Sequence, residues 1–391
     1  MNKCSYKQVV VISARRSAIS NVPGAFNQMQ EVDLLSTVFG EVSKDLHKWI
    51  DSAILGSAFP IERDNLCRKA VLASGIGSHV DCTTISKTCA SSDEALAMAY
   101  MQILSGKSQA VLVGGCEKVS NSPYILGFMK KRVKEAEKLQ LPLLNDVKKL
   151  VNENDMHYIA EILAHEHNIS RKAQDSYAIK SRLNAIDAYK SHRFDKEIIP
   201  ICYSKDNEEQ LCADELIQQI FKEDEIRSEK PMFVKDGMLT RYNTAPMCDC
   251  AVAMVIMDSE IARSASLKYL VEIADVSWIG VRKEDIGYAM KLCVKKILAN
   301  NHLSEEEIDL YEINESFAAQ AIIIMKELGI NHNKVNVNGG NLALGYPIGA
   351  SGLRMCITLI YEMLRSKARY GISTMCGGGA MANAVLFKNS N

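Results

Sequence analysis

Short apolar runs rich in β-branched residues alternate with amphipathic stretches through the first part of the chain. Residues 9–14, 53–56 and 109–115 are runs of this kind, and each predicts a buried strand. Between them, apolar positions at helical spacing predict helices over residues 33–46 and 93–104. This alternation of strands and helices predicts an α/β fold with a largely buried sheet.

The pattern changes at about residue 120 and returns at about residue 244. Residues 120–243 are polar and charged, with few strand-like runs and a long predicted helix over 171–189. Most of this charge is interpreted as an ordinary solvated surface. The change of pattern predicts that the stretch is an insertion that covers another part of the fold. After it, the pattern predicts strands at 251–257, 269–276, 308–313, 372–376 and 383–387, and helices at 315–328 and 349–365. Gly329 follows the first of these helices at the position where a glycine commonly ends one.

Composition is that of an ordinary globular protein. The chain has 391 residues, enough for two or three domains at roughly 150 residues each, with 47% apolar and 24% charged residues. A net charge of -1 gives no global field for nucleic acid or an anionic membrane, and no apolar run is long enough for a transmembrane helix. The first residues lack signal-peptide features, so a cytoplasmic location is expected.

The spacing of the cysteines and histidines predicts neither disulfides nor a metal site. Twelve cysteines are scattered without a Cys-x-x-Cys pair, so they are interpreted as reduced thiols, most of them buried. His165-Glu-His167 has the wrong spacing for two ligands on one helix face, and no metal is expected there.

The stretch Ser86-Lys-Thr-Cys-Ala-Ser-Ser92 places Cys89 between a β-branched run and a predicted helix. The unpaired N–H groups and partial positive charge at a helix N-terminus favour a thiolate. Cys89 is therefore a candidate nucleophile that carries an acyl group as a thioester, and its small neighbours would let a bulky donor approach. The alternative is a buried structural cysteine in a tight turn.

Three further stretches carry candidate chemistry. Cys376 ends a predicted strand and precedes three glycines, whose backbone N–H groups suit a developing oxyanion; the alternative is an inert thiol beside a glycine turn. Asn314 lies between a strand and a helix, where ligand sites are found in open α/β sheets. The glycine-rich stretch 336–352 also leads into a helix and could cradle an anion.

Taken in order, these motifs resemble the thiolase family nearly from end to end. The matching motifs are Cys89-Ala-Ser, Gly114-Gly-Cys-Glu, Asn314-Glu-Ser-Phe, Gly345-Tyr-Pro-Ile-Gly-Ala-Ser-Gly and Cys376-Gly-Gly-Gly. The openings Ser13-Ala-Arg-Arg-Ser and Gly24-Ala-Phe match as well. Several independent motifs in the right order and spacing make chance similarity negligible.

The resemblance implies an α/β thiolase fold, five-layered α-β-α-β-α, built from two similar halves with an inserted loop domain. The N-terminal half would comprise residues 1–119 completed by 244–268, the inserted loop domain over the coenzyme A site 120–243, and the C-terminal half 269–391. The resemblance also implies a homodimer or homotetramer, with no metal and no permanently bound cofactor.

The implied reaction is the Claisen condensation of two acyl-CoA molecules, or the reverse cleavage of a 3-ketoacyl-CoA by coenzyme A, in lipid metabolism. Cys89 would carry the acyl group, and Cys376 would remove the α-proton of the second acyl-CoA. The N–H groups of Cys89 and Gly378 would stabilise the first oxyanion, and Asn314 would orient a water for the second. The expected partners are acyl-CoA and coenzyme A, not nucleic acid or membrane.

Coenzyme A would lie across the inserted domain. The resemblance places Met156, Phe233, Ala245 and Phe317 at its site, with Phe233 near the adenine. Departures from the family pattern in the same region are Ala245 in place of serine, Gln218 in place of a basic residue, the altered stretch 286–290, and His157 beside Met156.

One departure bears directly on the chemistry, because the family's Gly-His-Pro is Gly345-Tyr-Pro in this chain. The family histidine activates the nucleophilic cysteine. Tyr346 has an ordinary pKa near ~10, so it can donate a hydrogen bond but accepts a proton poorly at neutral pH. Loss of a general base costs about 10²–10⁴-fold in rate. The alternatives are therefore a thiolase-like acyl transfer to another acceptor, or a catalytically attenuated acyl-CoA-binding subunit.

Overall fold

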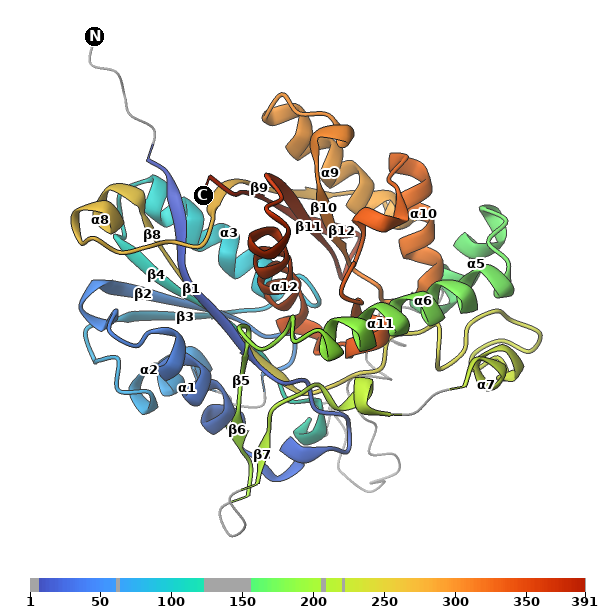
Figure 1. Cartoon of the computed structure of the whole chain (residues 1–391), viewed down its shortest axis with the longest axis horizontal. Helices are drawn as coiled ribbons and strands as arrows, with labels where there is room; N and C mark the ends of the chain where they lie inside the picture. The colour runs from blue at the N-terminus through green and yellow to red at the C-terminus, as the bar shows by residue number, and fades with distance from the viewer. Residues whose placement is uncertain (1–6, 61–63, 123–155, 205–208, 220–221, 391) are drawn as a thin grey trace, which may run out of the picture.

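Two similar halves of the chain each form a sheet, and the sheets join through one strand of each (Figure 1). The structure is a computed structural model that describes residues 7–60, 64–122, 156–204, 209–219 and 222–390. In the first half the strand order is β3 (Asp81–Ile85), β2 (Ile50–Gly56), β4 (Ala110–Glu117), β8 (Cys250–Asp258) and β1 (Val9–Ser17). The first three strands are mutually parallel, whereas β8 runs antiparallel to both of its neighbours. Every position of β4 and β8 is buried, as expected for strands covered on both faces.

The second half repeats this arrangement. Its strand order is β10 (Leu310–Ile313), β11 (Tyr370–Gly377), β12 (Met381–Lys388) and β9 (Glu272–Gly280). β10 and β11 are parallel, and β12 is antiparallel to both of its neighbours, as β8 is in the first half. A single parallel bridge from Tyr311 to Val335 occupies the place that β3 has in the first half. β9 pairs with β1, which joins the two halves.

The helices complete the layers. They are α1 (Glu31–Val42), α2 (Leu66–Ala73), α3 (Ser91–Leu104), α8 (Ser259–Ser264), α9 (Ala289–Asn300), α10 (Ala318–Leu328), α11 (Asn341–Leu344) and α12 (Ser351–Ser366). α3 and α12 pack on each other and on strands of both halves, so they form the middle layer. α1 and α2 cover the outer face of the first half, and α9 covers that of the second. The predicted α-β-α-β-α order is confirmed.

The described part of the stretch 120–243 touches both halves. It contains α5 (Met156–Glu166), α6 (Arg171–Lys190), α7 (Glu223–Ser228), β5 (Ile198–Ile199), β6 (Ile201–Cys202) and β7 (Gln210–Leu211). α6 packs on α10 and α11 of the second half, while β5 pairs with β1 of the first. The insertion therefore contacts both halves, through β1 of the first and through α10 and α11 of the second (Figure 1). The domain boundaries themselves stay a prediction.

The helix predicted over residues 315–328 begins later than expected, at Ala318. The residues before it are extended, because Phe317 forms an antiparallel bridge with Thr244 and the Ser316 carbonyl accepts the Ala245 N–H at 3.0 Å. Pairing with a distant segment thus outweighs the local helical preference. The predicted end is confirmed, since Gly329 closes α10 with a φ of 67°.

Glu315, in this extended stretch, ties the insertion to the second half. From α6 its carboxylate accepts the Tyr177 hydroxyl at 2.8 Å and the Ser181 hydroxyl at 3.0 Å. From the second half it accepts the Asn336 amide at 2.6 Å and the Leu342 N–H at 3.1 Å. Glu315 is fully buried, so each of these donors would lose its partner without gaining water if the carboxylate were removed.

We expect Glu315→Gln to lower the free energy of unfolding by about 2–3 kcal/mol, because an amide nitrogen would face donors where an oxygen now accepts. Urea unfolding followed by circular dichroism measures this. Glu306→Gln, at an exposed position, is the matched control and should change the midpoint little. Equal midpoints for the two variants would contradict the role of Glu315.

Candidate active site

Cys89 lies in the turn between β3 and α3. Thr88 directly before it has a left-handed φ of 52°, which turns the extended chain into the helix. The Ser91 hydroxyl fixes this turn, since it accepts the Lys87 N–H at 2.8 Å and donates to the Thr88 carbonyl at 2.5 Å. The candidate nucleophile therefore sits on a turn that is held by its own hydrogen bonds.

The Cys89 side chain shares one cluster with Cys376 and Tyr346. Cys89 is partly exposed as a residue and packs on the apolar cluster that contains both of those side chains. Burial of the sulfur, and then the nearby Cys376, raises the pKa of the Cys89 thiol to about 12, although a hydrogen bond with Tyr346 opposes the rise. The prediction that the helix N-terminus holds this sulfur as a thiolate is wrong for this structure, because loss of water outweighs the helix.

Cys376, in β11, lies among three polar side chains: Asn314 and Ser316 from the connection between β10 and α10, and Gln320 from the first turn of α10. Asn314 donates to its sulfur at 3.1 Å, the Ser316 hydroxyl lies 3.9 Å away, and Gln320 also makes a hydrogen bond to it. These bonds lower the pKa of the Cys376 thiol, but burial is the larger effect and the net shift is upward. Cys376 is 3% exposed and stays neutral at pH 7.

All the polar groups of the Asn314 side chain are engaged. Its amide donates to Ser316 at 2.8 Å and to Cys376 at 3.1 Å, and its carbonyl accepts from Asn341 at 2.6 Å. The Asn341 carbonyl in turn accepts from the buried guanidinium of Arg354 at 2.5 Å. A chain of hydrogen-bond donors thus runs from the Arg354 guanidinium through Asn341 and Asn314 to the Ser316 hydroxyl and the Cys376 thiol. A water held by Asn314 would replace one of these bonds, and its role stays a prediction.

The backbone of Tyr346 is held on both sides by one neighbouring segment. Its N–H donates to the Pro246 carbonyl at 2.8 Å, and its carbonyl accepts the Cys248 N–H at 3.3 Å. Gly345 before it has a φ of 112°, and a Cβ there would lie 2.6 Å from the Cys248 sulfur. A residue larger than glycine does not fit, so the direction of the Tyr346 side chain is set by its backbone.

The Tyr346 hydroxyl links the Cys89 thiol to Ser316. It accepts from the Ser316 hydroxyl at 3.2 Å and makes a hydrogen bond with the Cys89 thiol. Burial, together with the two nearby thiols, raises the pKa of Tyr346 well above its ordinary value. A neutral phenol of this kind can donate to Cys89, but it cannot hold the thiol proton as a base.

The glycines after Cys376 meet the Cys89 turn. The Gly378 N–H donates to the Thr88 hydroxyl, and a Cβ at Gly378 would lie 2.6 Å from that oxygen. The predicted oxyanion donor is therefore beside the nucleophile, but it is occupied in this structure. A ligand oxygen would have to displace the Thr88 hydroxyl before Gly378 could stabilise it.

One buried carboxylate connects the loops that carry the site. Glu117, the last residue of β4, accepts the N–H groups of Ala58 at 2.9 Å, Phe59 at 3.1 Å and Gly349 at 2.8 Å. The first two lie after β2 in the first half, whereas Gly349 lies between Tyr346 and α12 in the second. Glu117 therefore holds one loop of each half to the other.

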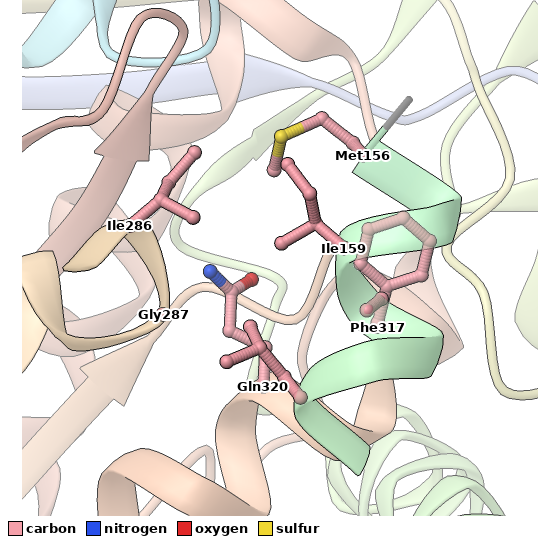
Figure 2. Close-up of a pocket in the computed structure, with 8 residues that line it drawn as sticks. Met156, Ile159, Ile286, Gly287, Phe317 and Gln320 are labelled. Atoms are coloured by element: carbon pink, nitrogen blue, oxygen red, sulfur yellow. The ribbon is translucent and has the colours of Figure 1, made fainter. Parts of the chain in front are cut away.

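A small pocket adjoins the cluster that contains Cys376 and Tyr346 (Figure 2). Its lining is mostly apolar and consists of Met156, Ile159, Ala160, Leu163, Ile286, Gly287, Phe317 and Gln320. Two of the residues predicted to line the coenzyme A site, Met156 and Phe317, thus face one space, and Ala245 is buried in the cluster that the two thiols share. Gln320 is the polar exception: its amide points into the pocket, and its Oε1 has no hydrogen-bond partner in the part of the chain that the structure describes.

Phe233 is outside the lining of this pocket. Its ring is 39% exposed and stacks on His157, with 3.8 Å between ring centroids. His157 also meets Phe317 edge-on at 5.5 Å. The aromatic predicted beside an adenine is therefore covered on one face by a side chain of its own chain, and His157 reaches the pocket wall through Phe317.

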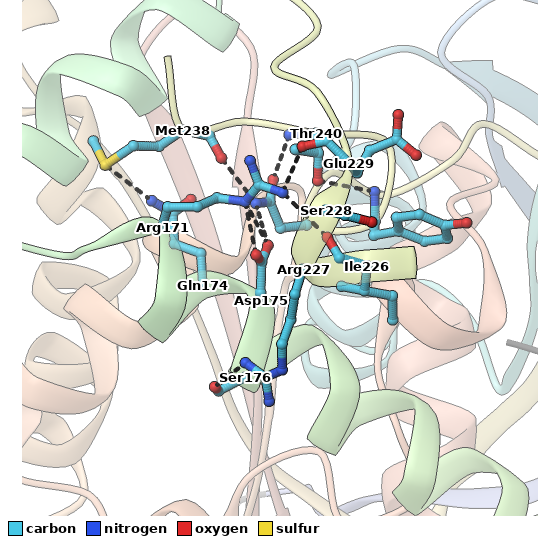
Figure 3. Close-up of polar contacts among 12 residues, drawn as sticks. Arg171, Gln174, Asp175, Ser176, Ile226, Arg227, Ser228, Glu229, Met238 and Thr240 are labelled. Atoms are coloured by element: carbon cyan, nitrogen blue, oxygen red, sulfur yellow. Dashed lines mark hydrogen bonds and ion pairs between the residues drawn. The ribbon is translucent and has the colours of Figure 1, made fainter. Parts of the chain in front are cut away.

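The segment that carries Phe233 is tied to α6 by Arg171 (Figure 3). The guanidinium bonds both oxygens of Asp175, at 2.8 and 2.7 Å. It also donates to the carbonyls of Ile226 at 3.1 Å and Glu229 at 2.9 Å. The insertion thus fixes this segment through its own helix, independently of any ligand.

Sequence reasoning did not single out Ser316, Gln320 or Thr88 as site residues. Ser316 and Gln320 follow Asn314 by two and six residues, and Thr88 directly precedes Cys89. Their proximity to those candidates was the available signal, but a pattern does not show which neighbouring side chains turn toward the sulfurs.

Two other features, a metal-binding cluster and a membrane-spanning helix, are absent from the described ranges. Among these residues, no group of three or more His, Cys, Asp or Glu side chains could hold a metal ion. None of the described helices is long and apolar enough to span a membrane.

Comparison with known families agrees with this geometry. The chain matches the thiolase N-terminal domain over residues 9–260 and the thiolase C-terminal domain over residues 267–389. The two matches account for nearly all of the described sheet and helices. The chain therefore belongs to the thiolase family, whose fold it has.

Individual relatives span almost the whole chain. An acetyl-CoA acetyltransferase of Chromobacterium violaceum is 33% identical over 392 residues, covering 97% of this chain and 98% of the relative. The solved acetyl-CoA acetyltransferase of Bacillus anthracis is 32% identical with a TM-score of 0.93, covering 98% and 99% of the two chains. Human mitochondrial 3-ketoacyl-CoA thiolase is 27% identical with the same TM-score, covering 98% and 100%. The chain is thus a thiolase-type acyltransferase similar to these enzymes.

The raised pKa of Cys89 predicts how this thiol reacts with iodoacetamide. Below a pKa of about 12 the thiolate fraction grows tenfold per pH unit, so the alkylation rate should rise throughout pH 6–9 without a plateau. Cys82 is an internal control, because hydrogen bonds from Cys67 and Arg68 lower its pKa to about 7, and its rate should level off above that pH. Peptide mass mapping separates the two sites, and a plateau for Cys89 near pH 7 would contradict the expectation.

Proposed function

We propose that this chain condenses two acetyl-CoA or acyl-CoA molecules, or cleaves a 3-ketoacyl-CoA with coenzyme A, through an acyl-Cys89 intermediate. The observation that carries the proposal is that Cys89 and Cys376, from different halves of the chain, share one buried cluster. Formation of a carbon–carbon bond between two thioesters needs both groups, one sulfur to hold the first acyl group and another to take the α-proton of the second.

In the first step Cys89 attacks the thioester carbonyl and releases coenzyme A. The N–H groups of Cys89 and Gly378 stabilise the oxyanion once the substrate oxygen has displaced the Thr88 hydroxyl. In the second step Cys376 removes the α-proton, and a water oriented by Asn314 stabilises the enolate oxygen. The enolate carbon bonds to the acyl carbon as the bond from that carbon to the Cys89 sulfur breaks, and the proton taken by Cys376 is passed on to the Cys89 sulfur. In the reverse direction Cys89 attacks the 3-keto carbonyl, and Cys376 returns a proton to the α-carbon that departs.

The pocket beside Cys376 takes the apolar part of the substrate. Met156 and Phe317 line it, and Ala245 lies in the adjoining cluster. Solved thiolases with bound coenzyme A are among the similar structures, at 26% and 30% identity. Phe233 is proposed to offer its exposed ring face to the adenine, the other face being covered by His157. Coenzyme A is thus a substrate and product, and no permanently bound cofactor is proposed.

A second candidate function follows from Tyr346. This residue stands beside Cys89 with a pKa well above its ordinary value, so it does not replace a histidine base. An attenuated acyl-CoA-binding subunit, or an acyl transfer to a different acceptor, would fit a site that acylates slowly. Both differ from the main proposal in the fate of the acyl group on Cys89.

The protein is also proposed to work in the cytoplasm as a homodimer or homotetramer. All described cysteines are free thiols, which suits a reducing compartment. Among the described strands, β3 pairs on one side only. Leu72, Met98 and Met101 on the adjacent helices α2 and α3 are 50%, 38% and 48% exposed. An open strand edge flanked by exposed apolar side chains suits contact with a second copy.

For the reaction, we expect wild-type protein to cleave acetoacetyl-CoA with coenzyme A and to gain one acetyl group on Cys89. Loss of the thioester absorbance and intact mass measure the two events, with Cys89→Ala as control. Tyr346→His supplies a base and should raise the rate by about 10²-fold or more. Turnover no higher than that of Cys89→Ala, with no acyl adduct, would contradict the proposal. An adduct without carbon–carbon chemistry would favour the second candidate.

For the assembly, Met101→Glu should weaken self-association, because a charge would be buried against the second copy. Light scattering coupled to size-exclusion chromatography gives the mass. Leu183→Glu is the matched control, since Leu183 is 47% exposed on α6 of the insertion. A monomeric wild-type protein would overturn the assembly proposal.

A further inference from the structure

Two hydroxyl side chains, of Tyr346 and Ser316, form a continuous line between the two candidate catalytic sulfurs. Cys89 makes a hydrogen bond with the Tyr346 hydroxyl, which accepts from the Ser316 hydroxyl at 3.2 Å, and Ser316 lies 3.9 Å from the Cys376 sulfur. Ser316 is 9% exposed and Tyr346 8% exposed, so water has little access to the two hydroxyls. A proton that leaves Cys89 on the side of Tyr346 therefore enters a line of hydroxyls that are shielded from solvent.

The groups along this line are suited to passing a proton on and not to holding it as a charge. The pKa values of both thiols and of the phenol are raised, chiefly by burial, so each group is neutral at pH 7. A neutral hydroxyl can accept one proton while it gives up another, and this passes a proton along without forming a buried charge. The line therefore supplies what Tyr346 alone does not, a destination for the thiol proton.

We propose that Ser316 is a positioning residue that joins Tyr346 to Cys376, so that the proton lost by Cys89 is relayed to the sulfur that leaves as coenzyme A. This inference rests on the proposed function. Asn314 holds Ser316 in place, since its amide donates to the Ser316 oxygen at 2.8 Å. The Ser316 hydroxyl hydrogen lies toward Tyr346 in the resting site and can turn to Cys376, because either atom of that contact can donate.

The transfer balances without an added base. The bond from the Cys89 sulfur to the acyl carbon forms as the bond from that carbon to the coenzyme A sulfur breaks. In the resting site the Ser316 hydroxyl donates to Tyr346, so the hydrogens of both hydroxyls turn toward Cys376 before the transfer. The Cys89 proton then passes to Tyr346, the Tyr346 proton to Ser316, the Ser316 proton to Cys376, and the Cys376 proton to the departing sulfur. Each residue ends neutral with its hydrogen replaced, and coenzyme A leaves as a thiol. In the condensation step the line runs back toward Cys89: Cys376 takes the α-proton as its own proton passes through Ser316 and Tyr346 to the departing Cys89 sulfur.

The first test uses iodoacetamide and does not depend on acyl transfer. Ser316→Ala leaves Tyr346 without its donor, so Tyr346 becomes a weaker donor to Cys89 and alkylation of Cys89 at pH 7.5 should slow several-fold. Ser316→Thr keeps the hydroxyl and should restore the rate. Ser373→Ala removes a buried hydroxyl from the same strand as Cys376 and should leave the rate unchanged. Equal rates for Ser316→Ala and wild type would overturn the role of Ser316, and thermal melting checks that each variant is folded.

The second test follows acylation of Cys89 by acetyl-CoA in mixtures of light and heavy water. A relay moves several protons together, so the plot of rate against deuterium fraction should be curved in wild type and in Ser316→Thr. Ser316→Ala should acylate about 10–100-fold more slowly with an unchanged apparent KM. Tyr346→Phe should lose a similar factor, and the double variant little more than either alone. A straight plot in wild type, or additive losses, would overturn the relay.

The two tests separate the relay from the function on which it rests. Wild-type protein that never acquires an acetyl group would overturn the proposed function and the transfer with it, while the alkylation rates would still decide whether Ser316 acts on Cys89. Wild-type protein that acylates as fast as Ser316→Ala would leave the function standing and overturn the relay.

Discussion

The site depends on three backbone hydrogen bonds to one buried carboxylate. Glu117 accepts N–H groups from Ala58 and Phe59 in the first half and from Gly349 in the second. Each loop taken alone follows its own strand or precedes its own helix, and nothing local brings them together. The carboxylate bridges the loop after β2 and the loop of Tyr346, and the Ser86 hydroxyl, three residues before Cys89, donates to the Ala58 carbonyl at 3.2 Å. The turn of Cys89 is thereby linked to the loop of Tyr346. The chemistry is therefore a property of the junction between the halves and belongs to neither half separately.

Burial at that junction sets the electrostatic character of the site. Two thiols and a phenol, each of which would charge only at a cost in this environment, lie within one cluster with their pKa values raised. Hydrogen bonds from Asn314 and Gln320 offset part of the cost at Cys376 but do not reverse it. A site of this kind favours mechanisms in which protons move together with the breaking bonds, since any step through an isolated thiolate would first have to overcome desolvation.

Sequence alone was sufficient for the fold and for several of the chemical candidates. Cys89, Asn314, Tyr346 and Cys376 occur in motifs whose order is specific, and the structure brings them into one cluster or into direct contact. The acidity of Cys89 could not be predicted, because it depends on how much water the second half excludes. The start of α10 was missed for a related reason: residues 314–317 pair with a segment about 70 positions earlier, and only the folded chain reveals that partner.

Glu315 has a consequence for how the protein would lose activity. Its neighbours along the chain, Asn314 and Ser316, both contact Cys376, while its own carboxylate is held by two side chains of α6. Detachment of the insertion would remove two of the four donors to that carboxylate and so loosen the strand end that carries Asn314 and Ser316. On warming, the enzyme would then lose activity when α6 detaches, at a temperature where both central sheets are still folded. Activity would therefore detect this local opening earlier than any measurement of total secondary structure.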